Sequence, residues 1–362
     1  MLSNQTIQSS IDELRSITKI DLCVMDIQGT VAATTMDRVE ISMELIQEFT
    51  QSAADSQVVN GYYLFKVADE EETVYLLLAR GSEDAYMVGK IAVSQIRQLM
   101  TAYKEKLDRD SFLQNLILDN LLLVDIYNRA KKLHIPVEGS RAVFLVEAQT
   151  DDSEEIMELL KGLFIPYNGD YLTAVEEKSI ILIKSLSENE GYAELKNTAE
   201  MIVDMINAEA MVNAKAAYGT IVQELRDVSK SYKEAKMALD VGRIFYAEKD
   251  VIAYHALGIG RLIYQLPESL CRIFIREIFG SDDIPEEIDE EILTTVQKFF
   301  ENNLNISETS RQLYVHRNTL VYRIEKVQKA TGLDMRVFSD ALTFSIALMV
   351  VSYLKYLEAL ES

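Results

Sequence analysis

Two short helices joined by a tight turn are predicted at residues 305–332 (NISETSRQLYVHRNTLVYRIEKVQKATG), the stretch that most constrains the fold. Asn305 and Glu308 match a capping box, in which the Asn side chain accepts from a first-turn amide and the Glu reaches back. The first helix is expected to end at Leu313, because the next two residues leave room only for a sharp turn. The second helix carries an apolar stripe for the domain core. The residues of this stripe, which are spaced i, i+4 and i+7, are Leu320, Ile324 and Val327.

The polar face of the second helix is the candidate surface for double-stranded DNA. A helix that enters the major groove places its N-terminal residues at the base edges. The residues favoured for this contact are His316, Arg317, Asn318, Thr319 and Tyr322. Phosphate contacts position a protein without reading sequence. The residues favoured for that role are Ser307, Arg311, Arg323 and Lys326.

Side-chain chemistry suggests separate tasks within this set. Arg317 can pair bidentately with guanine and Asn318 with adenine, and each such pair contributes about 1–3 kcal/mol of discrimination. Thr319 and Tyr322 suit contacts with phosphate or a thymine methyl group. Arg323 lies near the buried face of the helix, so it could instead pair with an acid of its own domain. Solvated surface positions remain the alternative for several of the others.

Net charge has to be judged locally in this chain. The formal charge of -22 is unfavourable for binding DNA, yet residues 307–336 carry six basic against three acidic side chains. Phosphates would repel the rest of the chain, which favours docking through one face. A basic excess of this size is common on protein surfaces, so charge alone does not establish DNA binding.

The remaining composition points to a soluble protein without a catalytic centre. Cys23 and Cys271 lie far apart in sequence and each follows an apolar residue, which favours buried thiols over a disulfide or a nucleophile. His134, His255 and His316 are too scattered for a metal site or a triad, so no catalytic residue, metal or cofactor is expected. The N-terminus lacks a signal pattern, and charges interrupt the apolar stretches, so a cytoplasmic protein that does not engage a membrane is predicted.

The first 134 residues are predicted to hold two parts of a multidomain α+β chain, which has room for roughly two or three domains. Residues 1–103 combine an amphipathic helix (Ile7, Ile11, Leu14) with strands at 20–26, 30–34, 61–67 and 73–80. This pattern is typical of a PAS-like sensor for a small molecule, with a dimerisation scaffold as the alternative. Residues 104–134 are predicted to form a connecting helix and dimer seam, unless its stripe packs within its own subunit.

The other parts follow after residue 134. Residues 135–255 follow the β-α-β-β-α-β order of a ferredoxin-like, cyclase-like domain. It is called a degenerate GGDEF-like domain, because the Gly-Gly-acidic-acidic-Phe signature is missing and Gly169-Asp170-Tyr171 is a poor substitute. Residues 256–284 are predicted to be a linker. Residues 285–362 are predicted to be an all-α helix-turn-helix domain, with Ile292, Val296 and Phe299 packed under the motif.

Several runs of residues resemble the sugar-diacid and purine-catabolism family of bacterial transcription regulators, most closely its sugar-diacid branch. They are residues 315–323 (VHRNTLVYR), 331–334 (TGLD), 231–235 (SYKEA) and 257–259 (LGI). The resemblance implies an effector-responsive regulator of carbohydrate or organic-acid catabolic genes that binds operator DNA as a homodimer or higher homo-oligomer. Family diacid-recognition domains carry Arg-Ile-Gly followed by His. Arg38 matches, but that glycine and histidine are missing, so the effector, a carboxylate among the candidates, stays open.

Two other classes of function compete with this interpretation. In one, the cyclase-like domain senses or converts a nucleotide and the C-terminal helices dock a partner. In the other, the chain is an interaction scaffold that uses only its helical seam. Nucleotide binding or turnover would favour the first alternative, and failure to bind DNA at low salt would favour the second.

Overall fold

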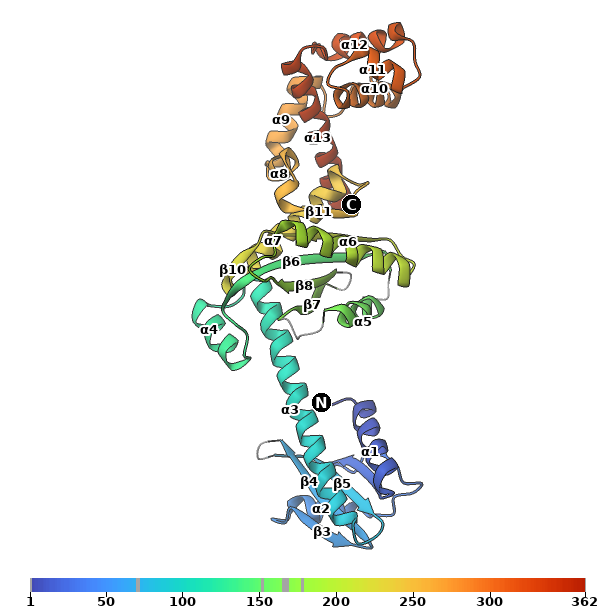
Figure 1. The fold of residues 1–362 in the computed structure, drawn as a ribbon, viewed down its shortest axis with the longest axis vertical. Coiled ribbons are helices and arrows are strands. Elements are labelled where there is room, and N and C mark those ends of the chain that lie inside the picture. The colour runs from blue at the N-terminus through green and yellow to red at the C-terminus, as the bar shows by residue number, and fades with distance from the viewer. Residues whose placement is uncertain (1, 70–71, 151–152, 165–168, 177–178, 362) are drawn as a thin grey trace. The chain divides into compact units, whose positions relative to one another are not determined.

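A computed structural model describes residues 2–69, 72–150, 153–164, 169–176 and 179–361. Its contacts divide the chain into two compact units, Met1–Leu113 and Gln114–Ser362, each of which is described by itself (Figure 1).

The first unit is built around an antiparallel sheet with the strand order β2-β1-β5-β4-β3. Its elements are α1 (Asn4–Thr18), β1 (Asp21–Asp26), β2 (Val31–Thr34), α2 (Met43–Gln51), β3 (Ser56–Val59), β4 (Tyr62–Asp69), β5 (Glu72–Arg80) and α3 (Ala85–Ile117). The predicted strands and N-terminal helix are confirmed. The predictions missed α2 and β3, because β3 has four residues and α2 has nine, too few for a clear periodic pattern.

Alternation along the strands divides the apolar residues of this unit between two cores. Leu22 and Val24 of β1 face the core that contains residues of α1 and α3. Cys23 and Met25, which alternate with them, face the core that contains Phe49 of α2. Successive side chains of a strand point to opposite faces, so the sheet is covered by helices on both sides.

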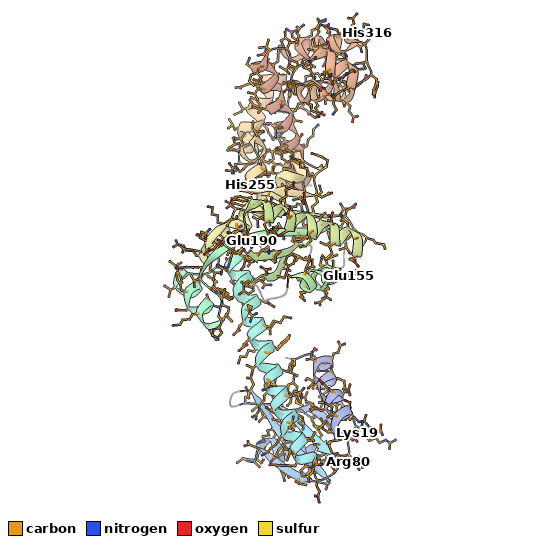
Figure 2. All side chains as sticks on the ribbon, in the orientation of Figure 1. Lys19, Arg80, Glu155, Glu190, His255 and His316 are labelled. Carbon is orange, nitrogen blue, oxygen red and sulfur yellow. The ribbon has the colours of Figure 1, made fainter. Side chains whose placement is uncertain are left out.

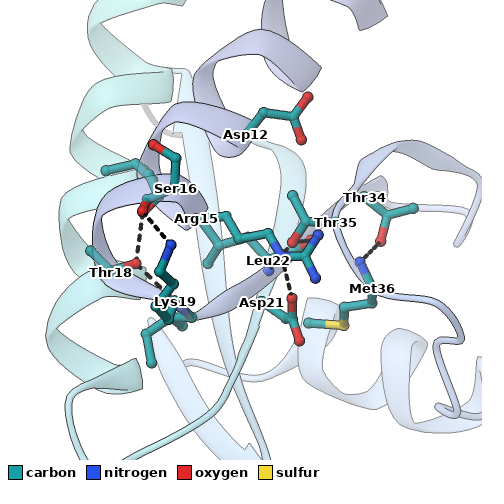
Figure 3. A network of polar contacts seen from close by, with 12 residues as sticks. Asp12, Arg15, Ser16, Thr18, Lys19, Asp21, Leu22, Thr34, Thr35 and Met36 are labelled. Atoms are coloured by element: carbon teal, nitrogen blue, oxygen red, sulfur yellow. Dashed lines mark hydrogen bonds and ion pairs between the residues drawn. The ribbon is translucent and has the colours of Figure 1, made fainter.

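Polar contacts fix the end of α1 to the start of the sheet (Figure 3). Arg15 forms an ion pair with Asp21 at 2.8 Å. The hydroxyl of Thr35 accepts a hydrogen bond from the amide of Leu22 at 2.9 Å. Lys19 ends the helix in a left-handed conformation and donates to the carbonyl of Ser16 at 2.9 Å. The helix therefore ends where β1 begins, without a free linker.

The predicted connecting helix at residues 104–134 is wrong as a single helix. Residues 101–107 are exposed within α3, as the charged composition of this section predicts. The helix then ends at Ile117, and α4 (Leu123–Lys132) follows after a break. At the break Asp119 has a φ of 62°, and its carboxylate pairs with Lys233 at 2.6 Å. A contact with a residue distant in sequence therefore accompanies the end of the helix.

The middle of the chain has the predicted ferredoxin-like order. Its elements are β6 (Glu138–Ala148), α5 (Ser153–Leu163), β7 (Tyr171–Glu176), β8 (Ser179–Ser185), α6 (Tyr192–Glu209), β9 (Ala214–Tyr218), β10 (Val222–Glu224), α7 (Val228–Phe245) and β11 (Val251–Ala253). The strand order is β11-β9-β6-β8-β7, with β10 paired to β6. The short strands β10 and β11 were not predicted. Gly219 allows α7 to approach the sheet, since an added Cβ would lie 2.0 Å from the carbonyl oxygen of Ser231.

Residues 256–284 are not a free linker as predicted, because they pack into the C-terminal core. The helices of this part are α8 (Ile259–Tyr264), α9 (Glu268–Phe279), α10 (Glu290–Glu301), α11 (Ile306–Gln312), α12 (Arg317–Thr331) and α13 (Phe338–Glu361). Cys271, Ile275 and Phe279 of α9 share one buried cluster with residues of α10, α12 and α13. The predicted positions Ile292, Val296 and Phe299 are buried in the same cluster.

The last helix corrects the prediction about apolar stretches. By length and composition, Phe338–Leu360 could cross a membrane, with a mean hydropathy of 1.3 in its most apolar window. In the folded chain, however, Phe344, Ala347 and Val350 are buried in the C-terminal core. Over the whole window, 39% of the residues are buried.

Both cysteines are predicted to be unreactive in the native protein. Cys23 and Cys271 are 0% and 1% exposed, and burial raises the pKa of each thiol. Because the thiolate is the reactive species, both should react with a thiol reagent such as DTNB only after unfolding in urea. Rapid reaction of either thiol in native buffer would contradict the buried positions.

Candidate nucleic-acid interface

Helix α11 begins with half of the predicted capping box. The side chain of Asn305 accepts a hydrogen bond from the amide of Glu308 at 3.1 Å, as predicted. The Glu308 carboxylate does not reach back. It accepts instead from Arg311 at 2.6 Å and from Gln312 at 3.1 Å. Glu308 thus stabilises the helix through neighbours one turn later, and the reciprocal half of the prediction is wrong.

The turn between the two helices places an aromatic side chain in water. Tyr314 follows Leu313, the C-cap of α11, and has a φ of 55°. Val315 donates its amide to the carbonyl of Ser310 at 3.0 Å, as in a Schellman ending. Glycine is the usual residue at the left-handed position of this motif, yet Tyr314 is 95% exposed there. The predictions missed Tyr314, although a large ring in a two-residue turn has little to pack against.

Helix α12 is oriented by the predicted apolar stripe. Leu320, Ile324 and Val327 are buried, in one cluster with Val296 of α10. Helix α12 contacts both α10 and α11. Burial of this stripe directs the opposite, polar face to solvent.

The predicted base-reading residues lie together on that exposed face. The exposed members of the predicted DNA-contact set are Ser307, Arg311, His316, Arg317, Asn318, Thr319 and Tyr322. His316 is the N-cap of α12, and its Nδ1 atom accepts a hydrogen bond from the Asn318 amide at 3.2 Å. Figure 2 shows His316 at the end of the C-terminal helices, away from the middle sheet. The Nε2 edge of the ring is therefore the one left for a ligand.

Arg317 differs electrostatically from four other basic residues of this region that pair with acids, namely Arg311, Arg323, Lys326 and Arg336. In the part of the chain that the structure describes, it has neither an ion-pair nor a hydrogen-bond partner for its side chain. The first turn of α12 contains no acidic side chain, whereas α10 has Glu290 and Glu291 and α11 has Glu308 in theirs. A cation at a helix N-terminus opposes the helix dipole, and an anion bound there would relieve that cost.

Two predicted phosphate anchors are engaged inside the domain. Arg323 is 13% exposed, donates to the hydroxyl of Thr295 at 2.9 Å and pairs with Glu291. Lys326 lies 4.0 Å from Asp289. For Arg323 the structure has the alternative arrangement, a pair with an acid of its own domain, because the long side chain folds back over α10. Arg311, by contrast, pairs with Glu308 while its own side chain stays 78% exposed.

Sequence comparison identifies two regions of this chain. Residues 292–350 match the family described as the PucR C-terminal helix-turn-helix domain. Residues 120–241 match the family described as the GGDEF-like domain. The two matches cover the α10–α13 region and most of the middle sheet described above.

Three similar proteins are bacterial regulators by name. A purine catabolism regulatory protein of Bacillus subtilis (strain 168) is 26% identical over 198 residues, which are 54% of this chain and 37% of that protein. This chain therefore spans little more than a third of that relative. The carbohydrate diacid regulator of Escherichia coli (strain K12) is 22% identical over 75% of this chain and 73% of its own length. The proline-responsive transcriptional activator PutR of Bacillus subtilis (strain 168) is 21% identical over 86% and 77%.

One solved structure shows a weak similarity to this chain. The regulator of polyketide synthase expression from Bifidobacterium adolescentis is 14% identical, with a TM-score of 0.32 over 67% of this chain and 97% of that one. A likeness this weak carries no argument about the fold or the site.

Replacing Arg323 tests whether it is a structural residue. Arg323→Ala should lower the free energy of unfolding by about 1–3 kcal/mol, because it leaves Thr295 without its charged donor. The measurement is urea denaturation. The slope of DNA affinity against salt concentration should stay unchanged, since Arg323 does not face the exposed surface. A reduced salt slope with unchanged stability would instead make Arg323 a phosphate contact.

Replacing Tyr314 separates strain from binding. Tyr314→Gly should stabilise the fold by about 1 kcal/mol, because glycine adopts a positive φ without steric cost. The same change should weaken DNA binding, since it removes an exposed aromatic ring beside the N-terminus of α12. Thermal denaturation and a DNA titration at fixed salt measure the two effects. Higher stability with unchanged DNA affinity would exclude Tyr314 from the interface.

Proposed function

We propose that this chain, which belongs to the sugar-diacid and purine-catabolism family of bacterial transcription regulators, is an effector-responsive DNA-binding regulator of catabolic genes. The observation that carries the proposal is the exposed N-terminus of α12, where Arg317 lacks a partner among the described residues and Asn318 lies next to it. Carbohydrate and organic-acid catabolism is the proposed target, by similarity to the carbohydrate diacid regulator. A cytoplasmic location follows from this role.

DNA contacts divide into reading and positioning roles under this proposal. Arg317 and Asn318 read base edges, while Thr319 and Tyr322 contact phosphate or a thymine methyl group. His316 offers its free ring edge to the same groove. Exposed Arg311 and Ser307 on α11 are the proposed phosphate contacts. Arg323 is left out, because its guanidinium is engaged with Thr295 and Glu291.

The first unit is proposed as a PAS-like sensor. Support comes from its antiparallel sheet, which is covered by α1 and α3 on one face and by α2 on the other. A small sheet covered in this way can enclose a ligand between strand and helix. A small carboxylate remains a candidate effector for this unit. The first half of α3, including Val88 and Ile96, belongs to the core of this unit, so a change at the sheet reaches the helix directly.

A homodimer is proposed as the state that binds operator DNA. Along α3, Ile91, Tyr103 and Leu107 are exposed apolar residues of the predicted stripe, at 50%, 37% and 49% exposure. Val88 and Ile96 of the same stripe are buried in their own unit, so only part of the stripe is left for a partner. Dimers of helix-turn-helix proteins contact half-sites about 34 Å apart or at multiples of that distance. A shift of α3 would alter that spacing and hence DNA affinity.

The middle domain is proposed to act without catalysis. Asp170, in the segment that poorly substitutes for the cyclase signature, is 5% exposed, and it accepts from the amide of Ser185 at 2.8 Å. Burial raises the pKa of this carboxyl. A buried carboxylate bonded to backbone is suited to holding the β7–β8 hairpin rather than to binding a metal nucleotide.

Loss of sequence reading tests the proposal. The double change Arg317→Ala and Asn318→Ala should weaken binding to DNA from upstream of the protein's own gene by at least about thirtyfold, because each base pair contact contributes about 1–3 kcal/mol. Fluorescence anisotropy at fixed salt measures the affinity. Arg276→Ala on α9 removes one exposed cation from the same unit and serves as the control. Equal affinity of the double variant and the wild type would end the assignment of α12 as the reading helix.

A further inference from the structure

A cavity of about 570 Å³ lies in the middle domain, at the edge of the sheet formed by β9 and β11. Residues of α6, of both strands and of the segment that follows β11 line it. This volume falls within the usual range for small-molecule sites, about 300–1,000 Å³. The cavity is separate from the DNA-contact face of α11 and α12, since none of its lining residues belongs to those helices.

The floor of the cavity contains a tyrosine hydroxyl that is open to the cavity. Tyr218, the last residue of β9, lines the cavity and is 2% exposed. Its hydroxyl has no hydrogen-bond partner among the residues that the structure describes. Because this oxygen is not itself enclosed by protein, the hydroxyl can donate to a ligand or water in the cavity. Burial first, and then the carboxylate of Glu200, raise the pKa of Tyr218, so it remains a donor at neutral pH.

Aromatic rings cluster beside the Tyr218 ring. The Tyr218 ring packs against Phe144 at 5.4 Å between centroids and against His255 at 6.1 Å. Tyr192 packs against His255 at 4.3 Å and so limits the positions of its ring. Figure 2 labels His255 between the middle sheet and the C-terminal helices. Rings grouped in this way offer stacking surfaces for a flat ligand.

Charges on the cavity wall favour a ligand that donates hydrogen bonds. Glu200, Asp204 and Asp250 line the cavity, against the two cations Lys196 and Lys249. Lys196 lies 3.5 Å from Glu200, and Lys249 lies over the ring of Tyr246 at 4.6 Å. The carboxylates of Asp204 and Asp250 have no partner within the described ranges. Carboxylates accept hydrogen bonds and repel anions, so this wall suits amino groups better than phosphates or acids.

We propose that this cavity is a second effector site, which binds a flat, uncharged nitrogen heterocycle that carries an amino donor, the chemical class of adenine and its nucleoside. The heterocycle stacks beside His255. A ring nitrogen accepts from the Tyr218 hydroxyl, and the amino group donates to the carboxylates of the wall.

The cavity wall continues into the segment that carries the C-terminal helices. Tyr246 lines the cavity and donates its hydroxyl to the carbonyl of Leu257 at 3.2 Å. Gly258 follows with a φ of 52°, and α8 begins at Ile259. Tyr264 of α8 then donates to Asp240 of α7 at 2.9 Å. A ligand against Tyr246 and Leu257 would therefore act on the start of α8; this regulatory role, unlike the binding itself, rests on the proposed function.

Calorimetric titration of the full chain tests the site, with adenosine, adenosine monophosphate and tartrate as probes. Adenosine is expected to bind with a stoichiometry of one per chain. The monophosphate should bind at least tenfold more weakly and tartrate not at all, because the acidic wall repels anions. Tyr218→Phe should weaken adenosine about tenfold through the lost hydrogen bond. His255→Ala should do so by a similar factor through lost stacking.

Controls distinguish binding from folding. Tyr75→Phe removes a buried hydroxyl from the first unit and should leave adenosine affinity unchanged. Asp204→Asn changes an exposed residue, so it should weaken adenosine without altering the thermal midpoint. No heat with adenosine, or equal affinity in wild type, Tyr218→Phe and Asp204→Asn, would overturn the site.

DNA binding measured on the same preparations separates the two proposals. If the chain binds DNA but not adenosine, only the adenosine site is excluded. A chain that binds adenosine but no DNA keeps the site and loses its regulatory role.

Discussion

Burial of one face of α12 is the contact on which the DNA-facing surface depends. Leu320, Ile324 and Val327 lie in a core with residues of α9, α10 and α13, so the helix cannot rotate without exposing them. Burial of a large aliphatic side chain contributes about 1.5–3 kcal/mol, and three such residues hold the helix in one orientation. Asn318 is exposed because it lies on the opposite side, and Arg317 is exposed as the first residue of the helix. The same contact explains why the segment 256–284 is part of the domain, since α9 completes the core.

Several basic residues of the C-terminal helices pair with acids. Arg311, Arg323 and Arg336 each pair with an acid of their own domain, and the chain as a whole carries a net charge of -22. Such pairing is weak where the side chains are exposed, so Arg311 can exchange Glu308 for a phosphate. It is stronger for the largely covered Arg323. Under the proposed function, the acidic remainder would repel phosphates and favour docking of DNA on one face.

A polar junction connects the middle domain to the C-terminal helices. Asp240 of α7 accepts from Tyr264 of α8 at 2.9 Å and pairs with Arg243 at 3.2 Å, while Arg243 also pairs with Glu147 of β6. Burial, followed by the hydrogen bond to Asp240, raises the pKa of Tyr264, which therefore stays a donor. Hydrogen bonds have directional requirements that apolar packing lacks. The junction accordingly fixes how α8 leaves the middle sheet, close to the cavity lined by Tyr218 and His255.

Local pattern in the sequence determined the kind and order of most elements. The spacing of Leu320, Ile324 and Val327 specifies α12 and its exposed face, and the short apolar run at residues 142–146 specifies β6, because both patterns are set within one element. Contacts between distant residues decided the rest. The guanidinium of Arg323 contacts the hydroxyl of Thr295 and the carboxylate of Glu291 and is therefore largely covered. Asp119, just after the end of α3, pairs with the distant residue Lys233. The three-residue strands β10 and β11 exist through pairing with β6 and β9. Tertiary structure alone gathered Tyr218, Asp204 and His255 around one cavity, since residues from three elements meet there only after the sheet has formed.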